Sequence, residues 1–296
     1  MADAAPPLSV PSVLGNYVIE ALVVAGAFSQ VFRALDRELG RTVAVKVFSL
    51  SPDKEAGLPY DRAEWRRRFV AEARLLARMD HPHLVRVDAL GWLPDGTPYT
   101  VMPWHAANLR REIGRDLHDA DHPRALPAVE RPRALSAGRA RTVLRQVCLG
   151  LAALHAQGVV HRDVKPTNLL LTARENGVVR LCDLGFARGP GGSGMSRAGV
   201  WIGTADYCAP EQRADASRAT DRADIYAVGV LAYRLLTGML PVGAFSPVAA
   251  LGVADAGRWD ALIRAAMAPR PSDRPTAVEL AVELRKGAGA DEEGQY

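Results

Sequence analysis

The stretch HRDVKPTNLLL, which begins at His161, constrains this chain more than any other feature. It follows a long amphipathic pattern, precedes an apolar run, and places Asp163, Lys165 and Asn168 in one tight loop. Fifteen residues after Asn168, the stretch LCDLGFAR puts Asp183 just beyond a short predicted strand. A carboxylate for a hydroxyl, an ammonium for a phosphate, and an Asn with an Asp for metal ions are the groups that phosphoryl transfer needs. The alternative is a polar loop of purely structural function, and the full string argues against it.

The use of lysine supports this interpretation. Four of the 37 basic residues are lysines, which leaves 33 arginines. In a chain that favours arginine so strongly, Lys46 and Lys165 stand where a compact ammonium suits a phosphate oxygen better than a planar guanidinium does. An accidental placement of these two lysines is the weaker alternative.

Periodicity predicts a strand-rich part followed by a helical part. Short runs with β-branched residues and turn signals between them predict strands at 17–24, 30–35, 42–50, 84–93 and 98–104. Apolar residues at helical spacing predict helices at 61–79, 139–158, 223–238, 259–267 and 276–287. The expected fold class is therefore α+β, with a small strand-rich lobe, one helix within it, and a larger helical lobe joined by a hinge near Met102.

Composition excludes several classes of protein. Hydrophobic residues make up 48% and charged residues 24%, as in an ordinary soluble globular chain. The net charge of +4 is spread along the sequence, which disfavours a nucleic-acid partner. The three cysteines form no CxxC pair, and the histidines show no metal-ligand spacing. The longest apolar run ends at Arg234, too short for a membrane span, and no secretory signal begins the chain, so we expect a cytoplasmic location.

In its ordered motifs the chain resembles the eukaryotic-like (Hanks-type) serine/threonine protein kinases of bacteria, from about Tyr17 to about Lys286. The resemblance implies the bilobal protein-kinase fold. It also implies ATP and Mg²⁺ (or Mn²⁺) as cofactors, proteins with Ser or Thr hydroxyls as substrates, and self-association for trans-autophosphorylation. The expected segments are a disordered lead at 1–14, an ATP-binding N-lobe at 15–102, a catalytic C-lobe at 103–287 and an acidic tail at 288–296.

The resemblance also assigns roles to the motif residues. Lys46 of VAVK would bind the α- and β-phosphates, and Glu72 would hold Lys46 in place. Asp163 would orient the substrate hydroxyl and accept its proton, while Lys165 would meet the γ-phosphate. The residues expected to bind the metal are Asn168 and Asp183.

The stretch LVVAGAFSQVF, from Leu22, departs from the family pattern of three glycines, because Val24 and Ser29 replace two and only Gly26 remains. Taken alone it is an ordinary hairpin. Within the resemblance it becomes a stiffened phosphate lid that keeps the glycine nearest the phosphates, which predicts weaker ATP affinity. Pro103 at the hinge lacks an N–H, so the carbonyl there and the N–H of His105 would bind adenine. The other expected ATP contacts are Val23, Val31, Ala44, Met102 and Leu170.

The segment GTADYCAPEQ distinguishes protein kinases from small-molecule kinases. Here Thr204 would hydrogen-bond near Asp163 and Lys165. Glu211 would form a buried pair with Arg274, and Asp224 would brace the catalytic loop. The stretch between TGMLP and PSDRP is short for the family, which leaves protein-substrate docking open.

Regulation is expected next to the catalytic loop. In the family the arginine at the position of Arg162 usually pairs with a phosphorylated residue of the activation segment. That segment, GPGGSGMSRAGVW, offers Ser196 and, second, Ser193 as autophosphorylation sites. An unmodified loop is the alternative.

Two other functions compete with an active protein kinase. The depleted glycine loop favours a pseudokinase, a scaffold that binds ATP weakly, although Lys46, Glu72, Asp163, Asn168 and Asp183 are all present. A small-molecule phosphotransferase is disfavoured by the APE motif and Lys165. The Pro- and Arg-rich stretch 113–136 shows no period and is interpreted as a surface loop, with partner binding as its alternative.

Overall fold

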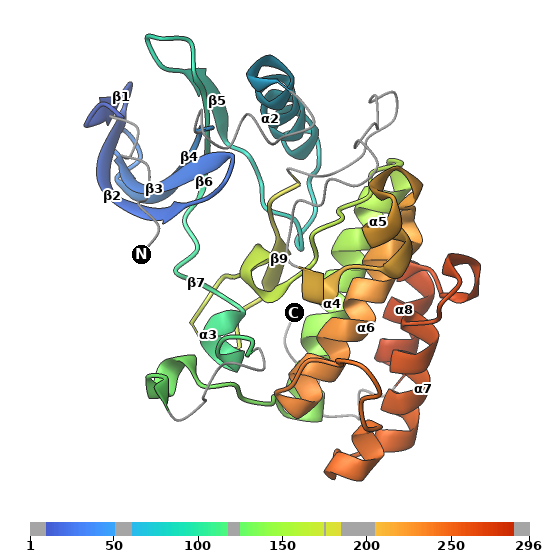
Figure 1. The fold of residues 1–296 in the computed structure, drawn as a ribbon. Helices are drawn as coiled ribbons and strands as arrows, with labels where there is room; N and C mark the ends of the chain where they lie inside the picture. The colour runs from blue at the N-terminus through green and yellow to red at the C-terminus, as the bar shows by residue number, and fades with distance from the viewer. Residues whose placement is uncertain (1–9, 51–60, 118–124, 175, 185–204, 287–296) are drawn as a thin grey trace. The chain divides into compact units, whose positions relative to one another are not determined.

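The chain divides into two compact units in the computed structural model, which describes residues 10–50, 61–117, 125–174, 176–184 and 205–286. The first unit ends at His105, and the second comprises 81–83 and everything from Ala106 onward. No helix among the described residues is long and apolar enough to cross a lipid bilayer. Figure 1 shows the strands and one helix of the first unit in blue to cyan, and the helices of the second in green to red.

The first unit is built on a six-stranded sheet in the order β1-β2-β3-β4-β6-β5, with every neighbouring pair antiparallel. Its core contains Phe32, Ala34, Val43, Val45, Val47 and Val101, all under a tenth exposed. Along β3 the buried residues alternate with more exposed neighbours, as a strand with one buried face requires, whereas β4 buries Val43, Ala44 and Val45 in succession. The strands are β1 (Val13–Leu14), β2 (Tyr17–Ala25), β3 (Ser29–Asp36), β4 (Arg41–Phe48), β5 (Ala89–Trp92) and β6 (Pro98–Pro103).

Helix α2 (Arg62–Leu76) is the helix described in the first unit. Asp61 caps it by accepting a hydrogen bond from the backbone N–H of Glu64 at 2.8 Å, which satisfies a donor that the first turn leaves open. The helix buries one face, formed by Trp65, Phe69, Ala73 and Leu76. The spacing of these residues is that of a single helical stripe, so the rest of α2 is left for other contacts.

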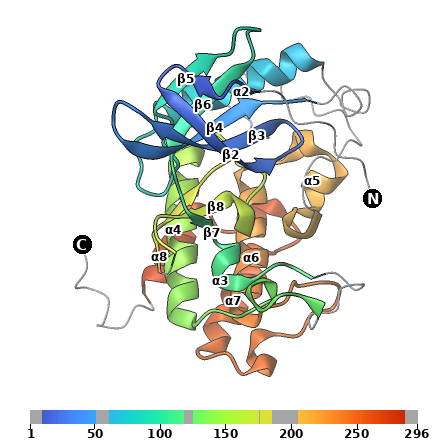
Figure 2. The ribbon, with the colours of Figure 1, turned by 90° about the vertical axis from the view of Figure 1, so that its left-hand side faces the viewer.

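The described part of the second unit contains four helices of nine residues or more. Helix α4 lies against α6 and α8, and α6 also lies against α7 (Figures 1 and 2). Helix α6 is buried along most of its length and ends at Gly238, whose φ of 77° is the left-handed conformation that glycine adopts most easily. The helices are α3 (Arg110–Ile113), α4 (Ala137–Ala156), α5 (Pro210–Ala214), α6 (Asp221–Thr237), α7 (Ala256–Ala266) and α8 (Ala277–Arg285).

A small antiparallel sheet, β7-β8-β9, completes the second unit. Its strands are β7 (Ala107–Asn108), β8 (Leu169–Leu171) and β9 (Val179–Leu181). Strand β8 directly follows the stretch that carries the phosphoryl-transfer motif and pairs with β7 and β9 (β7 and β8 are labelled in Figure 2, β9 in Figure 1). The backbone N–H of Leu181 donates to the carbonyl of His83 at 2.9 Å, which explains why residues 81–83 belong to this unit.

The structure differs from the sequence expectations at the short elements. The strand expected over 84–93 is limited to Ala89–Trp92, although Leu84, Val85 and Val87 are buried in an extended segment before it. Val13–Leu14 pair with β2, so the sheet starts inside the stretch expected to be a disordered lead. Between α6 and α7 the chain forms only a 3-10 turn, Val248–Leu251, in agreement with the short spacing there.

Candidate functional site

The first unit brings Lys46 of β4 together with Glu72 of α2. Their Nζ and Oε1 atoms are 2.9 Å apart, and both side chains are about a tenth exposed. The ammonium also lies 5.7 Å from the centre of the Phe69 ring, one turn before Glu72 on the same helix. A partly buried pair of this kind holds the lysine in one position, because moving either partner would leave a charge without its counter-ion.

The turn between β2 and β3 contains Gly26, whose backbone N–H donates to the carbonyl of Ser29 at 2.8 Å. A Cβ at Gly26 would lie 3.2 Å from that same carbonyl oxygen, so a side chain here would push the turn apart. The ring of Phe28, at the tip, stacks on Trp65 of α2 with centroids 4.3 Å apart. The turn that carries the remaining glycine is therefore attached to the helix that carries Glu72.

The other ATP-binding candidates of the first unit lie on strands. Val23 and Val24 are about half exposed, and the register shifts between Leu22 and Val24, so this end of β2 is irregular. On the neighbouring strands, Val31 of β3 is half-buried and Ala44 of β4 is buried.

The predicted hinge residues lie at the end of β6 and just after it, where Ala44 pairs with Met102. The Nδ1 atom of His105 lies 3.0 Å from the carbonyl oxygen of Pro103, the carbonyl expected to serve adenine. Nucleotide binding through this carbonyl therefore requires that the imidazole share or release it.

In the second unit, Asp163, Lys165 and Asn168 converge. The Oδ2 atom of Asp163 lies 2.8 Å from the Lys165 ammonium and accepts a hydrogen bond from Asn168 Nδ2 at 2.8 Å. The same amide nitrogen donates to the Asp163 carbonyl at 2.9 Å, which turns Asn168 Oδ1 away from these two acceptors. Because both bonds fall on Oδ2, Oδ1 of this buried carboxylate makes no hydrogen bond to any residue that the structure describes.

Asp183 lies next to this cluster. It follows β9, and the N–H of its neighbour Cys182 donates to the backbone carbonyl of Asn168 at 3.0 Å. Its φ of 64° is in the left-handed region, which a non-glycine residue adopts at a cost in strain. Leu170 of β8 is half-buried one strand away. Among the described residues no three His, Cys, Asp or Glu side chains form a metal-binding group. The assignment of Asn168 and Asp183 as metal ligands stays a prediction.

Asp224 of α6 braces the same loop by accepting hydrogen bonds from its backbone. Its carboxylate accepts the N–H of His161 at 2.9 Å, the N–H of Arg162 at 2.7 Å and a hydrogen bond from Nε2 of His155 at 2.8 Å. Burial by itself raises the pKa of this carboxyl, but the His155 hydrogen bond and the surrounding donors hold the pKa below its ordinary value. Arg162 has a φ of 68°, so this bracing holds a strained residue directly before Asp163.

We expect this arrangement to make the stability of the protein sensitive to acid. The folded-state pKa of Asp224 lies below its ordinary 3.8, so its contribution is complete above that pH and is lost as the pH falls through the folded pKa. Urea unfolding should give a higher free energy of unfolding for wild type than for Asp224→Asn at pH of about 6. The difference between the two proteins should become smaller below pH of about 3.8. A difference that stays constant with pH would contradict this account.

Glu211 of α5 and Arg274 form a bidentate ion pair, with distances of 2.6 and 2.9 Å. The Arg274 side chain is fully buried and also donates to the carbonyls of Ala268 and Arg222. Its guanidinium lies 5.0 Å from the centre of the Tyr226 ring on α6. Arg274 therefore joins α5, α6 and the turn before α8.

A second buried arginine is not predicted by the sequence. Arg234 of α6 is 1% exposed and lies 2.6 Å from Asp116, whose other oxygen accepts the Tyr207 hydroxyl at 3.0 Å. The sequence signal is an arginine inside an apolar helix, which by itself indicates only where the apolar run ends. A small cavity of about 200 Å³ lies beside Asp116 and Tyr207, with Lys165 and Thr167 of the catalytic loop in its wall.

The described part of the stretch 113–136 contains exposed residues, as expected of a surface loop, and is also hydrogen-bonded to the rest of the second unit. Arg234 donates to the carbonyls of Ile113, Arg115 and Arg133. Arg133 in turn donates to the carbonyls of Arg111, Glu112, Ala128, Val129 and Arg131. Two arginines thus donate hydrogen bonds to backbone carbonyls that have no partner within a helix or a sheet, because this segment is irregular.

Most of the regulatory candidates, Ser193, Ser196 and Thr204, lie outside the described residues. Arg162, which is described, is half-buried, and its carbonyl accepts a hydrogen bond from Gln212 of α5 at 2.9 Å.

Comparison with known proteins decides the family. Residues 17–249 match the model of the protein kinase domain. The chain belongs to the protein kinase family. PknL, a serine/threonine-protein kinase of Mycobacterium tuberculosis, is 35% identical over 306 residues, covering 96% of this chain and 68% of PknL. A probable serine/threonine-protein kinase, PknB of Corynebacterium glutamicum, is 34% identical over 293 residues, covering 91% of this chain.

A solved structure shows the same fold. The kinase domain of Mycobacterium tuberculosis PknI, in a double-mutant form, superposes with a TM-score of 0.67 at 27% sequence identity, covering 96% of this chain and all of the PknI domain. The expected α+β protein-kinase fold is therefore confirmed. The match spans 42% of the length of the Corynebacterium PknB.

Proposed function

We propose that this protein kinase domain transfers the γ-phosphoryl group of ATP to Ser or Thr hydroxyls of proteins, itself included. The observation that carries the proposal is the cluster of Asp163, Lys165 and Asn168, in which Oδ2 of the aspartate is occupied and Oδ1 is left for a substrate. That is the arrangement a base needs, since an acceptor oxygen must be within hydrogen-bond reach of the proton that it removes.

Each residue then has a defined task. Oδ1 of Asp163 accepts the proton of the substrate hydroxyl while the hydroxyl oxygen forms a bond to the γ-phosphorus. The bond from that phosphorus to the β–γ bridging oxygen breaks, and ADP leaves with the electron pair. Lys165 offsets the charge on the transferred group, and Lys46, held by Glu72, offsets charge on the α- and β-phosphates.

The oxygen donors fit a hard divalent cation. The carboxylate of Asp183 and Oδ1 of Asn168 are the ligand types that Mg²⁺ and Mn²⁺ bind. Among the described residues, Oδ1 of Asn168 accepts only a long hydrogen bond of 3.5 Å from the Thr167 hydroxyl. When bound, the cation neutralises phosphate charge and orients the phosphates. We propose Mg²⁺ as the ion, and turnover with Mg²⁺ alone against Mn²⁺ alone tests the choice.

A transfer assay tests the function. Radiolabelled ATP is incubated with the protein alone and with a generic basic protein, and the labelled residues are identified by mass spectrometry. We expect label on serine and threonine. ATP binding without any transfer would overturn the proposal and leave a scaffold.

We further propose that autophosphorylation occurs between two copies, in a cytoplasmic setting, with Ser196 as the first site and Ser193 as the second. The initial rate per molecule should rise with protein concentration if the reaction is intermolecular. A concentration-independent rate, or phosphopeptides that lack Ser196, would contradict these points separately.

We expect Val24→Gly to lower the apparent KM for ATP by about two- to threefold. Glycine at this half-exposed position would let the backbone approach the nucleotide more closely than valine does. Steady-state kinetics with varied ATP measure the effect, and Leu22→Gly, which changes an exposed residue on the same strand, is the matched control. Equal kinetics for Val24→Gly and wild type would show that the missing glycine does not limit binding.

We expect Glu72→Gln to lower kcat/KM for ATP by about 10²-fold, because the Lys46 ammonium loses the charge that positions it. Glu64→Gln is the matched control, since Glu64 lies on the same helix but pairs with Arg67 and Arg68. Similar losses in the two variants would indicate a general effect on α2 and not a role for the Lys46 pair.

A further inference from the structure

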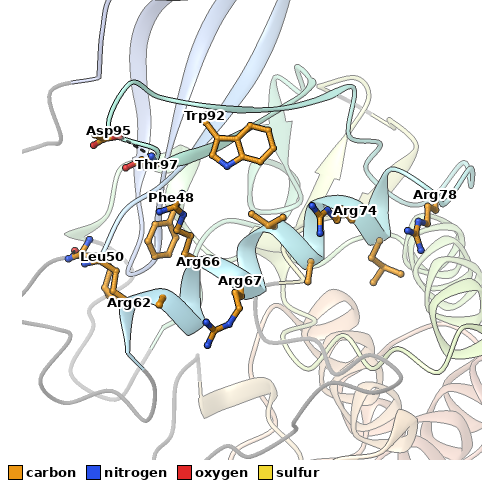
Figure 3. Close-up of a pocket in the computed structure, with 14 residues that line it drawn as sticks. Phe48, Leu50, Arg62, Arg66, Arg67, Arg74, Arg78, Trp92, Asp95 and Thr97 are labelled. Atoms are coloured by element: carbon orange, nitrogen blue, oxygen red, sulfur yellow. Dashed lines mark hydrogen bonds between the residues drawn. The ribbon is translucent and has the colours of Figure 1, made fainter.

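A groove of about 1180 Å³ lies along α2, on a side of the helix that its buried stripe leaves free (Figure 3). One wall is the helix itself, with the small residues Ala63 and Ala71 between larger side chains. The other wall comes from the end of β4, from Trp92 at the end of β5, and from Asp95 and Thr97 in the turn between β5 and β6. Lys46, Glu72 and the catalytic loop are not among its lining residues.

Positive charge dominates this groove. Five arginines line it, Arg62, Arg66, Arg67, Arg74 and Arg78, and Asp95 is the one carboxylate among the lining residues. Asp95 accepts the backbone N–H of Thr97 at 2.8 Å, the contact drawn as a dashed line in Figure 3.

Arg74 and Arg78 have no internal counter-ion among the described residues. Arg67 is paired with Glu64 at 2.8 Å. The side chains of Arg74 and Arg78, by contrast, are exposed and take part in no ion pair or hydrogen bond with the residues that the structure describes. Their charges remain available to a ligand.

The floor between the arginines is apolar. Val70 and Leu75 of α2 are half-buried, and the Trp92 ring opposite them is 52% exposed. An exposed tryptophan next to arginines is the composition that protein interfaces favour, because both residues contribute strongly when a partner removes water from them.

The shape of the groove indicates an extended ligand. From Arg62 to Arg74 the helix rises roughly 18 Å, at about 1.5 Å per residue. An extended peptide covers that length with about six residues at roughly 3.3 Å each. A second copy placed groove to groove would bring like charges together, so a symmetric contact between two grooves is disfavoured.

We propose that this groove binds an acidic segment of a partner protein. Asp or Glu side chains of the partner segment form ion pairs with Arg74 and Arg78. One apolar side chain between these acidic residues packs on Val70, Leu75 and Trp92. The complementarity has two parts, charge at the rim and an apolar contact at the floor, and both are needed for recognition.

Binding of a synthetic probe tests the proposal. The probe is a short fluorescein-labelled peptide in which glutamates flank a Leu–Phe pair, and fluorescence anisotropy measures its affinity. We expect Arg74→Glu with Arg78→Glu to weaken binding by at least about tenfold. Arg37→Glu with Arg264→Glu changes the net charge equally at exposed arginines outside the groove and should weaken it by less than about threefold. A peptide with Ser–Ser in place of Leu–Phe should also bind at least about tenfold more weakly.

Four results would overturn the proposal. They are the absence of binding to wild type at millimolar peptide, equal losses in the two double variants, no effect of the Ser–Ser change, and a wild-type dimer that Arg74→Glu with Arg78→Glu dissociates in sedimentation equilibrium. The last result would assign the groove to a second copy. Circular dichroism establishes that the variants are folded, and none of these measurements depends on phosphoryl transfer.

Discussion

Asp163→Asn is expected to lower kcat for phosphoryl transfer by about 10²- to 10⁴-fold, while the apparent KM for ATP stays within about threefold. The amide has nearly the shape of the carboxylate, so its oxygen can still receive Lys165 and Asn168 at the place of Oδ2. The other position becomes an NH₂ group, which cannot accept the proton of a substrate hydroxyl. The loss therefore falls on the chemical step and not on nucleotide binding.

Stopped assays over a long time course, with saturating ATP and a fixed peptide substrate, measure this loss. Asp80→Asn, which makes the same change at an exposed aspartate, is the control and should retain wild-type kcat. If Asp163→Asn kept more than about a tenth of wild-type kcat, Asp163 would not be the base.

Arg274→Ala is expected to lower the free energy of unfolding by about 3–5 kcal/mol. The substitution leaves the Glu211 carboxylate without its bidentate partner. It also removes the hydrogen-bond donor of several backbone carbonyl oxygens, among them those of Ala268, Pro269 and Arg222. It also removes a fully buried side chain that packs on Tyr226.

Urea unfolding followed by far-ultraviolet circular dichroism measures the change. Arg270→Ala, at an exposed arginine four residues earlier, should change the free energy of unfolding by less than about 0.5 kcal/mol. Should Arg274→Ala fail to fold, Glu211→Gln keeps the side-chain volume and should still destabilise the protein measurably. Wild-type stability in both variants would show that the buried pair contributes nothing net.

Local sequence is enough to place the chemistry. Asp163, Lys165 and Asn168 lie within six residues, so the turn that brings them together is encoded in one segment, and Asp183 follows directly from the next short strand. The long helices are predicted closely for a similar reason. Helix α4 begins after the capping side chain of Ser136 and ends before Gly158, and both signals are local.

Contacts between distant segments do not follow from the local sequence. The family resemblance predicts the Lys46–Glu72 and Glu211–Arg274 pairs, which the structure contains, but no local signal predicts the pair formed by Arg234. Arg234 and Asp116 are 118 positions apart, and nothing near either residue indicates the other. The short elements α3 and β7 are not predicted because neither is long enough to show a period. The strand expected over 84–93 is too long, because a run of apolar residues indicates that a segment is buried and not that it pairs with another strand. Leu84, Val85 and Val87 are buried, but they lie before the paired residues of β5.

The attachment of Phe28 to Trp65 has a consequence for conformational entropy. A loop with three glycines and a free tip samples many backbone states and must give them up when it closes over a nucleotide. Here two glycine positions hold Val24 and Ser29, and the tip is stacked on a buried indole of α2. The loop has therefore lost much of that freedom before any ligand binds, so closing over a nucleotide costs less conformational entropy. This compensates for part of the nucleotide affinity that is lost with the two glycines.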